Sequence, residues 1–391
     1  MASKYIDILK KNAMLIVLVL VYLFFTIMTS GQMFQAMNFN ALITQNAYVF
    51  ILATGMLMCM LTGGNIDLSC GSFVCFLGSV GAVMMAVKGM GTGVSIALML
   101  LIGVIYGCVL GFLIAYVNVP PWIATLAGFL AFRGLGTAIL SDNSTTGSVS
   151  LSNNEGYMAL FSGKLFSTPV GQMNMICLIA GIVAAAIVVI LNFSTRARKL
   201  KKGYEADSLV SVIVKSVLAV AAILLFAYKL ALSGGIPVVL VWVVVIILIY
   251  SFITSKTTMG RYFYTIGDNA ETTRLSGVDT KLIMFLAYLN MAVLTAITTF
   301  IVTSRFQAAN STAGTCYEMD AIAACVVGGV SAYGGSGTIF GMVVGATLIG
   351  VINLGMSLMG VNADWQKIVK GLVLLAAVVF DILAAKKNAT K

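Results

Sequence analysis

The residues with most chemical character gather in the polar segment 256–281, which reads KTTMGRYFYTIGDNAETTRLSGVDTK. It carries seven charged side chains, and a long apolar run lies on each side of it. Charged side chains and unpaired backbone groups are excluded from lipid, so this segment must face water. Its pattern favours contact with a partner.

Capping residues inside the segment predict a short helix, which would need something to pack against. Asp268 is a good N-cap, and Glu271 three positions later completes an Asp version of the capping box. Arg274 suits the negative end of the helix dipole, and Gly277 is a typical stop. These signals predict a helix near 269–276, which is too short to be stable alone in water. An ordinary cytoplasmic loop with a fortuitous cap is the alternative.

A second group of polar residues lies within or beside apolar runs and forms a candidate translocation pathway. Asp67 stands beside Ser69 between two apolar runs, where a carboxylate is expected to face a cavity, a partner or water. Capping of a helix that begins near Leu68 is the alternative function of Asp67. Arg133 lies inside an apolar run and should pair with an acid or snorkel. Asn290 and Asn353 complete this group.

A third group opens a span after 305–317 and is predicted to line an external vestibule or to meet a soluble partner. Its members are Arg305, Asn310, Tyr317, Glu318 and Asp320. Glu318 and Asp320 would also suit the start of a helix with no further role. In the last apolar run, Lys367 is best explained as a helix-end anchor.

The motifs that are missing exclude several classes of protein. The chain has no histidine, and its seven cysteines are scattered, so it offers no His-based relay, zinc site or redox pair. We find no P-loop, nucleophile elbow or zincin motif. We therefore predict no catalytic residue, metal site or cofactor on this chain. ATP and Mg, if used, must be bound by another chain.

Composition predicts the fold class. Of 391 residues, 60% are hydrophobic, and apolar runs of about 20 residues recur along the chain. The prediction is an all-α, polytopic membrane protein that forms a single domain over 1–391. It should have about twelve transmembrane helices, within a range of 10–12, some broken or re-entrant. The predicted spans are 13–30, 41–61, 66–87, 94–117, 121–140, 173–193, 208–230, 236–254, 282–303, 318–334, 338–358 and 365–385.

Charge sets the orientation of these spans. The N-terminus, 194–207, 256–281 and the C-terminal tail hold 15 of the 23 Lys and Arg residues. Twelve crossings place all four segments on one side, which the positive-inside rule identifies as cytoplasmic. Both termini and the basic loop 194–207 are then cytoplasmic, and the loop 141–171 is external. The net charge of +10 thus reflects orientation and not nucleic-acid binding.

Glycine is abundant, with 39 residues. Clusters at 63–64 and 328–337 favour close helix approach or helix breaks at membrane depth. The segments 63–82 and 328–346 share the spacing of their GG, GS and GA pairs, which suits a parallel internal repeat.

Several separate motifs resemble those of bacterial ABC sugar-importer permeases of the ribose/xylose/galactose class. The sequence GRYFYTIGDNAETTRLSGV at 260–278 is similar to the family's cytoplasmic coupling segment, with Thr272 and Thr273 in place of small residues. GGNIDLSCGS at 63–72, VPPWIATLAGFLAFRG at 119–134 and GTCYEMDAIAACVVGGVSAYGGSGTIFG at 314–341 resemble further motifs in the same order. The extra chain near 194–235 is most similar to the longer xylose or multiple-monosaccharide members.

The resemblance implies a permease of the bacterial inner membrane that works by alternating access. It implies a cytoplasmic ABC ATPase, an extracytoplasmic sugar-binding protein and a second permease copy as partners. The segment 255–281 would dock on the ATPase. Its implied coupling residues are Gly260, Arg261, Ile266, Gly267, Asp268, Asn269, Glu271, Arg274, Leu275 and Gly277. An ion-coupled secondary transporter, with Asp67 and Asn290 at broken helices, is the alternative.

Overall fold

A computed structural model of the chain describes residues 13–169, 172–204 and 208–389. Nine helices in these ranges are long and apolar enough to cross a membrane. The chain is therefore an all-α, multi-pass membrane protein, as its composition predicts. The following lie outside the described residues: Lys4, Lys10 and Lys11 near the N-terminus, residues 205–207 of the basic loop 194–207, and Lys391 of the C-terminal tail.

The helices follow one another with short connections. In chain order they are α2 (Ala13–Met28), η1 (Gln32–Phe34), α3 (Ala36–Leu61), α4 (Cys70–Ala82), η2 (Val83–Val87), α5 (Thr92–Ala115), α6 (Pro121–Asn143), α7 (Glu155–Phe161), α8 (Met175–Lys201), α9 (Leu209–Leu232), α10 (Val238–Lys256), α11 (Thr258–Asp268), α12 (Ala270–Leu275), α13 (Thr280–Phe306), α14 (Tyr317–Val327), α15 (Ile339–Leu358) and α16 (Ala363–Ala389).

Each of the twelve predicted spans corresponds to a helix, but one was predicted too long. The span 318–334 is realised as α14, which ends at Val327 and is followed by a loop without regular secondary structure. Gly328 and Gly329 follow the helix directly, and Gly329 has a φ of 83°. With 11 residues, α14 is about 16 Å long and cannot cross a membrane by itself. This finding agrees with the expectation of broken helices.

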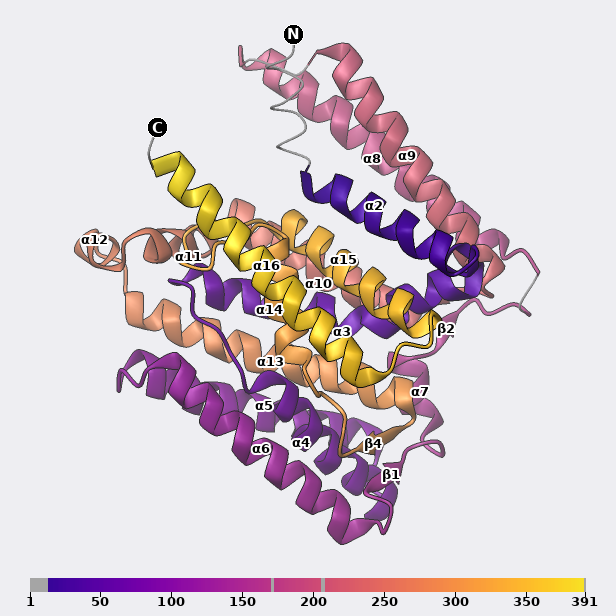
Figure 1. Ribbon diagram of the computed structural model, residues 1–391, viewed down its shortest axis with the longest axis vertical. Helices are drawn as coiled ribbons and strands as arrows, with labels where there is room; N and C mark the ends of the chain where they lie inside the picture. Colours follow the sequence, from indigo (N-terminus) through magenta and orange to yellow (C-terminus); the bar gives the residue numbers. More distant parts are fainter. Residues whose placement is uncertain (1–12, 170–171, 205–207, 390–391) are drawn as a thin grey trace.

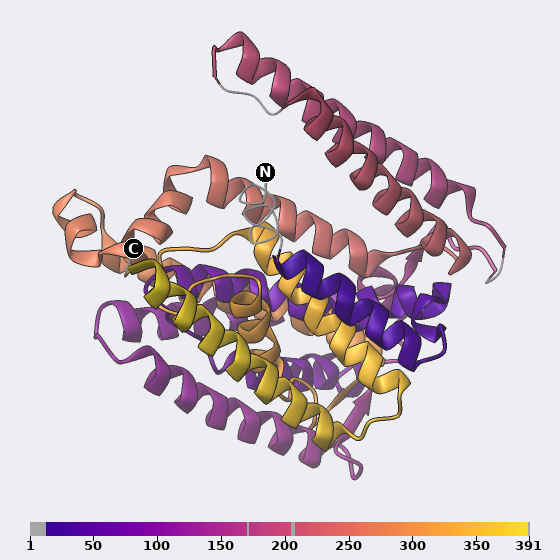
Figure 2. The same ribbon diagram turned by 45° about the horizontal axis from the view of Figure 1, so that its top comes forward.

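The helices form a buried centre and an outer layer (Figures 1 and 2). In α3, α4 with η2, α13 and α15, between 67% and 78% of the most apolar window is buried inside the protein. The share falls to 17% in α8 and 11% in α9. Both views place the hairpin of α8 and α9 at the edge of the molecule, while α11 and α12 project at one end.

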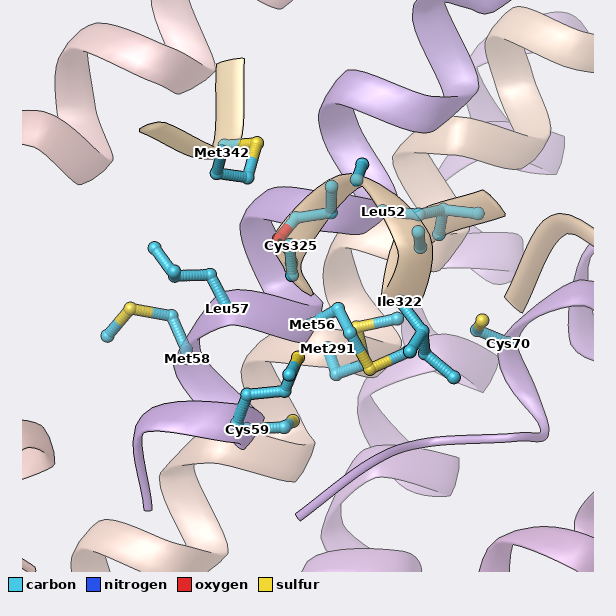
Figure 3. Close-up of a cluster of buried hydrophobic side chains, with 14 of the residues drawn as sticks. Leu52, Met56, Leu57, Met58, Cys59, Cys70, Met291, Ile322, Cys325 and Met342 are labelled. Carbon is cyan, nitrogen blue, oxygen red and sulfur yellow. Dashed lines mark hydrogen bonds between the residues drawn. The ribbon is translucent and has the colours of Figure 1, made fainter. Parts of the chain in front are cut away.

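The centre is rich in sulfur (Figure 3). Met56, Met58 and Cys59 of α3 are almost fully buried with Met291 of α13 and Cys325 of α14. Met342 and Cys70 join the same cluster. Flexible methionine side chains can fill the irregular spaces that arise where one helix is short and others are long.

Two helices begin inside the bundle and face each other. Ser69, just before α4, accepts a hydrogen bond of 2.6 Å from Tyr106 in the middle third of α5. Tyr317, the first residue of α14, stacks on Tyr48 in the middle third of α3. A Cβ added to Gly71 would lie 2.3 Å from the Gly314 carbonyl oxygen, so the two helix starts touch through backbone.

The glycine-rich segments that resemble each other in sequence also pack on each other. A Cβ on Gly64 would lie 2.1 Å from the Ala332 carbonyl oxygen, and one on Gly334 would lie 2.5 Å from the Cα of Gly63. Both glycines have positive φ, 74° and 94°. Only glycine allows this approach and this backbone conformation together.

The predicted external loop 141–171 is folded onto the bundle. Strand β1 (Ser148–Ser150) pairs antiparallel with β4 (Ala308–Asn310), and β2 (Lys164–Leu165) pairs with β3 (Ile236–Pro237). Tyr157 of α7 is fully buried and hydrogen-bonds the hydroxyl of Thr303 in α13 at 2.8 Å. The loop is therefore attached to a central helix through a specific polar contact.

Candidate functional site

The predicted coupling segment consists of two helices joined by a sharp turn. Thr257 caps α11 by accepting the Gly260 N–H at 3.0 Å. A Cβ on Gly260 would lie 2.0 Å from the Ile253 carbonyl oxygen, so the turn from α10 into α11 has no room for a side chain. The short α12 follows, at the position that the capping signals predicted.

The cap of α12 differs from the prediction. Asp268 is the last residue of α11, and Asn269 is the N-cap, accepting the Thr272 N–H at 2.9 Å. Asn269 has the non-helical φ of −160° that a cap requires, whereas Asp268 is still helical. The stop was predicted correctly: Gly277 has a φ of 86°.

Glu271 does not complete a capping box. Its carboxylate accepts two hydrogen bonds from Arg274 instead, the shorter at 2.7 Å, on an exposed face of α12. The hydrogen bonds and the positive charge of Arg274 lower the pKa of Glu271. The pair is a surface feature of the segment and is available to a partner.

The first helix of the segment is anchored to the bundle. Phe263 and Ile266 of α11 are buried in the central core. A Cβ on Gly267 would lie 2.0 Å from the Leu61 carbonyl oxygen and 2.2 Å from the Gly335 nitrogen. Gly335 N–H in turn donates to the Leu61 carbonyl at 3.2 Å. The end of α11, the end of α3 and the loop after α14 thus meet through their backbones.

The second helix is free to contact a partner. Leu275 at its end is 77% exposed and forms an apolar contact point on a helix that also carries charged side chains. A groove of about 520 Å³ lies beside it, lined mainly by polar residues of α11 and α12, among them Arg261, Thr265, Asp268 and Asn269. Anchoring at one end and exposure at the other suit a segment that transmits motion.

The candidate pathway residues divide into separate contacts. Asp67 is buried and accepts both the Ser69 N–H at 2.8 Å and the Ser69 hydroxyl at 2.5 Å. The helix begins at Cys70, not near Leu68, so Asp67 braces the turn before α4 without occupying its N-cap position.

Arg133 forms no close ion pair with an acid of the described residues and contacts backbone instead. Its Nη1 donates to the carbonyl oxygens of Ser311 at 3.2 Å and Ala313 at 2.8 Å. Arg133 therefore holds the extended chain that leads into α14, because a carbonyl at membrane depth needs a donor as much as a carboxylate does.

The two asparagines of this group lie elsewhere. Asn290 of α13 accepts a hydrogen bond from the Tyr250 hydroxyl of α10. Asn353 of α15 donates to Asn46 of α3 at 3.2 Å. Both link neighbouring helices, and no hydrogen bond joins Asn290 to Asp67 within the described part of the chain.

The external group is divided between surface and interior. Arg305, Asn310 and Tyr317 are half-buried. Glu318 and Asp320 are only 4% and 1% exposed, so in this conformation neither carboxylate can touch an external protein. Their positions in the first turn of α14, whose start lies inside the bundle, explain the difference from the prediction.

Sequence patterns did not reveal the partners of Asp320. Its Oδ2 accepts hydrogen bonds from the Tyr48 hydroxyl at 2.5 Å and from Lys370 Nζ of α16 at 2.9 Å. Tyr48 also stacks on Tyr317 with 3.7 Å between ring centroids. The sequence feature that could have revealed this pair is Lys370, because a cation inside an apolar run requires a buried partner.

Comparison with known proteins identifies the class of molecule. The family model described as "Branched-chain amino acid transport system / permease component" matches residues 38–378. The chain belongs to this permease family. The xylose transport system permease protein XylH of Haemophilus influenzae is 35% identical over 96% of both chains. XylH of Escherichia coli is 32% identical over 96% of this permease and 92% of its own length.

A more distant relative covers the permease equally well. The ribose import permease protein RbsC of Escherichia coli is 28% identical over 96% of this chain and 94% of its own. No solved structure matches the permease significantly. The relatives align almost end to end.

Proposed function

We propose that this permease is the membrane-spanning subunit of an ATP-driven importer for a monosaccharide, of the xylose or multiple-sugar kind. The observation that carries the proposal is the end-to-end similarity to two xylose permease proteins at 35% and 32% identity. The family description mentions branched-chain amino acids. We give the full-length relatives more weight for the substrate because they match the whole chain individually.

The proposal assigns the coupling role to residues 255–281. Motion of a partner ATPase would press on α12, whose Leu275 is exposed. Because Gly267 leaves no gap between α11, Leu61 and Gly335, a displacement of α11 reaches both α3 and the loop after α14. α3 carries Tyr48, which holds Asp320 at the start of α14. A chain of direct contacts thus leads from the coupling helix to the centre of the bundle.

The same scheme names the partners. ATP and Mg would bind to the cytoplasmic ATPase, and an extracytoplasmic sugar-binding protein would deliver the substrate. A second permease copy would complete the pathway. Both termini, 194–207 and 255–281 would lie on the cytoplasmic side, as the distribution of basic residues favours. No catalytic step is assigned to this chain.

The test uses one exposed leucine and a matched control. Leu275→Glu places a charge on α12, and Leu200→Glu places the same charge on an exposed leucine of α8, which is 53% exposed. We expect Leu275→Glu to abolish co-purification of the ATPase and uptake of labelled xylose, and Leu200→Glu to leave both intact. Equal behaviour of the two variants would refute the assigned role.

The energy source is tested in proteoliposomes that contain the complete transporter, with ATP enclosed in the lumen and the labelled sugar outside. Uptake should follow ATP and persist when the proton and sodium gradients are dissipated. Uptake that stops with the gradients while ATP is held constant would instead identify an ion-coupled transporter, the alternative function considered from the sequence.

A further inference from the structure

The peripheral hairpin formed by α8 and α9 has a basic cavity at one end. The cavity has a volume of about 160 Å³ and lies between the end of α8 and the start of α9. Asn192, Thr195, Arg196 and Lys199 line it from α8, and Lys215 faces them from α9. The four α8 residues are spaced so that they share one face of the helix. Their convergence is therefore a property of the helix and not of a loose tail.

An apolar groove adjoins this cavity. It has a volume of about 460 Å³, and it is lined by Val189 and Phe193 of α8 and by Ile213, Val217 and Leu224 of α9. Seven of its eight lining residues are apolar, and the exception is Ser216. Asn192 of the basic cavity donates a hydrogen bond of 3.2 Å to Ser216 of the groove, so the two spaces adjoin along the hairpin.

The order of the two spaces matches the direction of the helices. α8 runs toward the basic segment 194–207, and α9 runs away from it. The cationic residues therefore lie at the end of the hairpin, and the groove lies deeper in its apolar part. Asn192 donates to the Ser216 hydroxyl at 3.2 Å where the two spaces meet, which holds the helices together at the junction.

The described part of the chain does not fill the groove. Val217 is 61% exposed, and the whole hairpin lies at the edge of the bundle in both views (Figures 1 and 2). The hairpin contacts the bundle near the C-terminal end of α9. There Lys229 donates to the Phe34 carbonyl at 2.7 Å, and Phe226 packs on Phe39. Within the described residues the groove is therefore accessible to a ligand.

We propose that the α8–α9 hairpin binds an anionic phospholipid. The phosphate lies in the basic cavity, and one acyl chain lies in the adjoining groove. A basic pocket between transmembrane helices suits an anionic headgroup, and each cation near the membrane surface attracts anionic lipid. Glu205 and Asp207 in the connection between the helices reduce the positive charge of this end without reversing it. A phosphate without acyl chains would leave the apolar groove unexplained.

The chain offers a matched pair of charge variants. The pocket variant R196Q/K199Q/K215Q and the control variant R198Q/K201Q/K202Q each remove one Arg and two Lys from the same end of the hairpin. The control residues do not line the cavity. Attraction by overall charge would suffer equally in both variants, whereas a built site would be lost only in the first.

The readout is tryptophan quenching by brominated acyl chains in nanodiscs of the full-length protein. Val217→Trp places a reporter in the groove, and Ile179→Trp places one on α8 near its other end, where the side chain is 58% exposed. Each signal is taken as the difference from the parent protein in the same lipid. Headgroup preference is the ratio of quenching by brominated phosphatidylglycerol to that by brominated phosphatidylcholine at equal mole fraction.

We expect a several-fold preference for phosphatidylglycerol at Val217→Trp and none at Ile179→Trp. The pocket variant should remove the preference, and the control variant should retain it. Equal loss in both charge variants, or no preference in the parent, would overturn the proposal. Loss of the preference when millimolar inorganic phosphate is added would identify a free-phosphate site instead. Absence of quenching by either lipid at Val217→Trp would show that protein, such as a second copy, covers the groove.

Discussion

Gly267 at the end of α11 lies directly against the backbone of Gly335, which belongs to the loop between α14 and α15. The separation is so small that a Cβ on Gly267 would sit 2.2 Å from the Gly335 nitrogen. Two segments almost seventy residues apart are thus joined without an intervening side chain. Such a contact cannot slide without moving both partners.

Replacement of Gly267 by alanine should therefore disturb the permease. The methyl group must push α11 away from Leu61 and Gly335, and overpacking of this kind costs about 1–3 kcal/mol. We expect a lower midpoint in thermal unfolding and impaired uptake. Gly134→Ala in α6, where nothing lies within 4 Å of the added Cβ, is the control and should leave both unchanged. A neutral Gly267→Ala would contradict the rigid contact.

In the buried pair of Lys370 and Asp320, removing one charge should cost more stability than removing both. Asp320 is 1% exposed and Lys370 is 19% exposed at the side chain. Removing one charge from a buried pair leaves the other uncompensated and costs about 3–5 kcal/mol. Lys370→Met should therefore destabilise the permease strongly, and the double variant with Asp320→Asn should recover part of the loss. Thermal unfolding of all four members of the cycle measures the coupling.

The control for this cycle lies one turn earlier on the same helix. Lys367 pairs with Asp364 at the same distance of 2.9 Å, but both side chains are more than half exposed. Surface pairs contribute little because water screens them. Lys367→Met should leave the unfolding midpoint unchanged, and a loss equal to that of Lys370→Met would show that helix-wide packing, and not the buried charge, dominates.

The exposed pair on α12 should respond to pH in one direction. Arg274 lowers the pKa of Glu271, so the stabilisation from this pair is fully present above the ordinary pKa of a glutamate and is lost as pH falls through the lowered value. Near neutral pH it should not vary. Carbon-13 NMR of the labelled carboxyl group should show a midpoint that rises to the ordinary range in Arg274→Gln. An unchanged midpoint would mean that the pair does not persist in solution.

Tyr48 should fix the position of the Asp320 carboxylate through a hydrogen bond, while Lys370 balances the negative charge of that carboxylate. Tyr48→Phe removes one hydrogen bond to Asp320 but leaves Lys370 in place and keeps the ring that stacks on Tyr317. We expect a loss of about 1–3 kcal/mol in the free energy of unfolding, as for a buried acceptor that loses a donor. Tyr48→Ala, which also removes the stacking, should cost more. Equal losses would show that the stacked ring contributes nothing beyond the hydrogen bond, and an unchanged Tyr48→Phe would show that the hydrogen bond contributes nothing.

Much of this architecture could be read from the sequence, because lipid imposes a simple length rule on apolar helices. In the described part of the chain, a helix lies near each of the twelve predicted spans, nine of them long and apolar enough to cross a membrane, and the short helix at 270–275 also lies where it was predicted. The length of α14 was not, since an apolar run continues past Val327 while Gly328 and Gly329 end the helix. The N-cap of α12 was missed by one residue, because Asp268 and Asn269 are chemically similar caps and only backbone conformation distinguishes them.

Contacts between distant segments lay beyond the sequence. Nothing in the spacing of Asp320 and Lys370 reveals that α14 and α16 lie side by side, and a buried carboxylate cannot be distinguished from an exposed one at the start of a helix. Arg133 was recognised as needing a partner, but backbone carbonyls are available everywhere and carry no signature. Which carbonyl groups Arg133 contacts depends on the segment before α14 lying inside the bundle, and the sequence does not show this.

The sulfur-rich centre in Figure 3 has a chemical consequence for the lifetime of the protein. Oxidation of Met56, Met58 or Met291 would convert an apolar thioether into a polar sulfoxide in a place with no water to solvate it. Burial protects these side chains only while the helices stay closed around them. Their oxidation by added peroxide should therefore be slow in the folded protein and fast after unfolding.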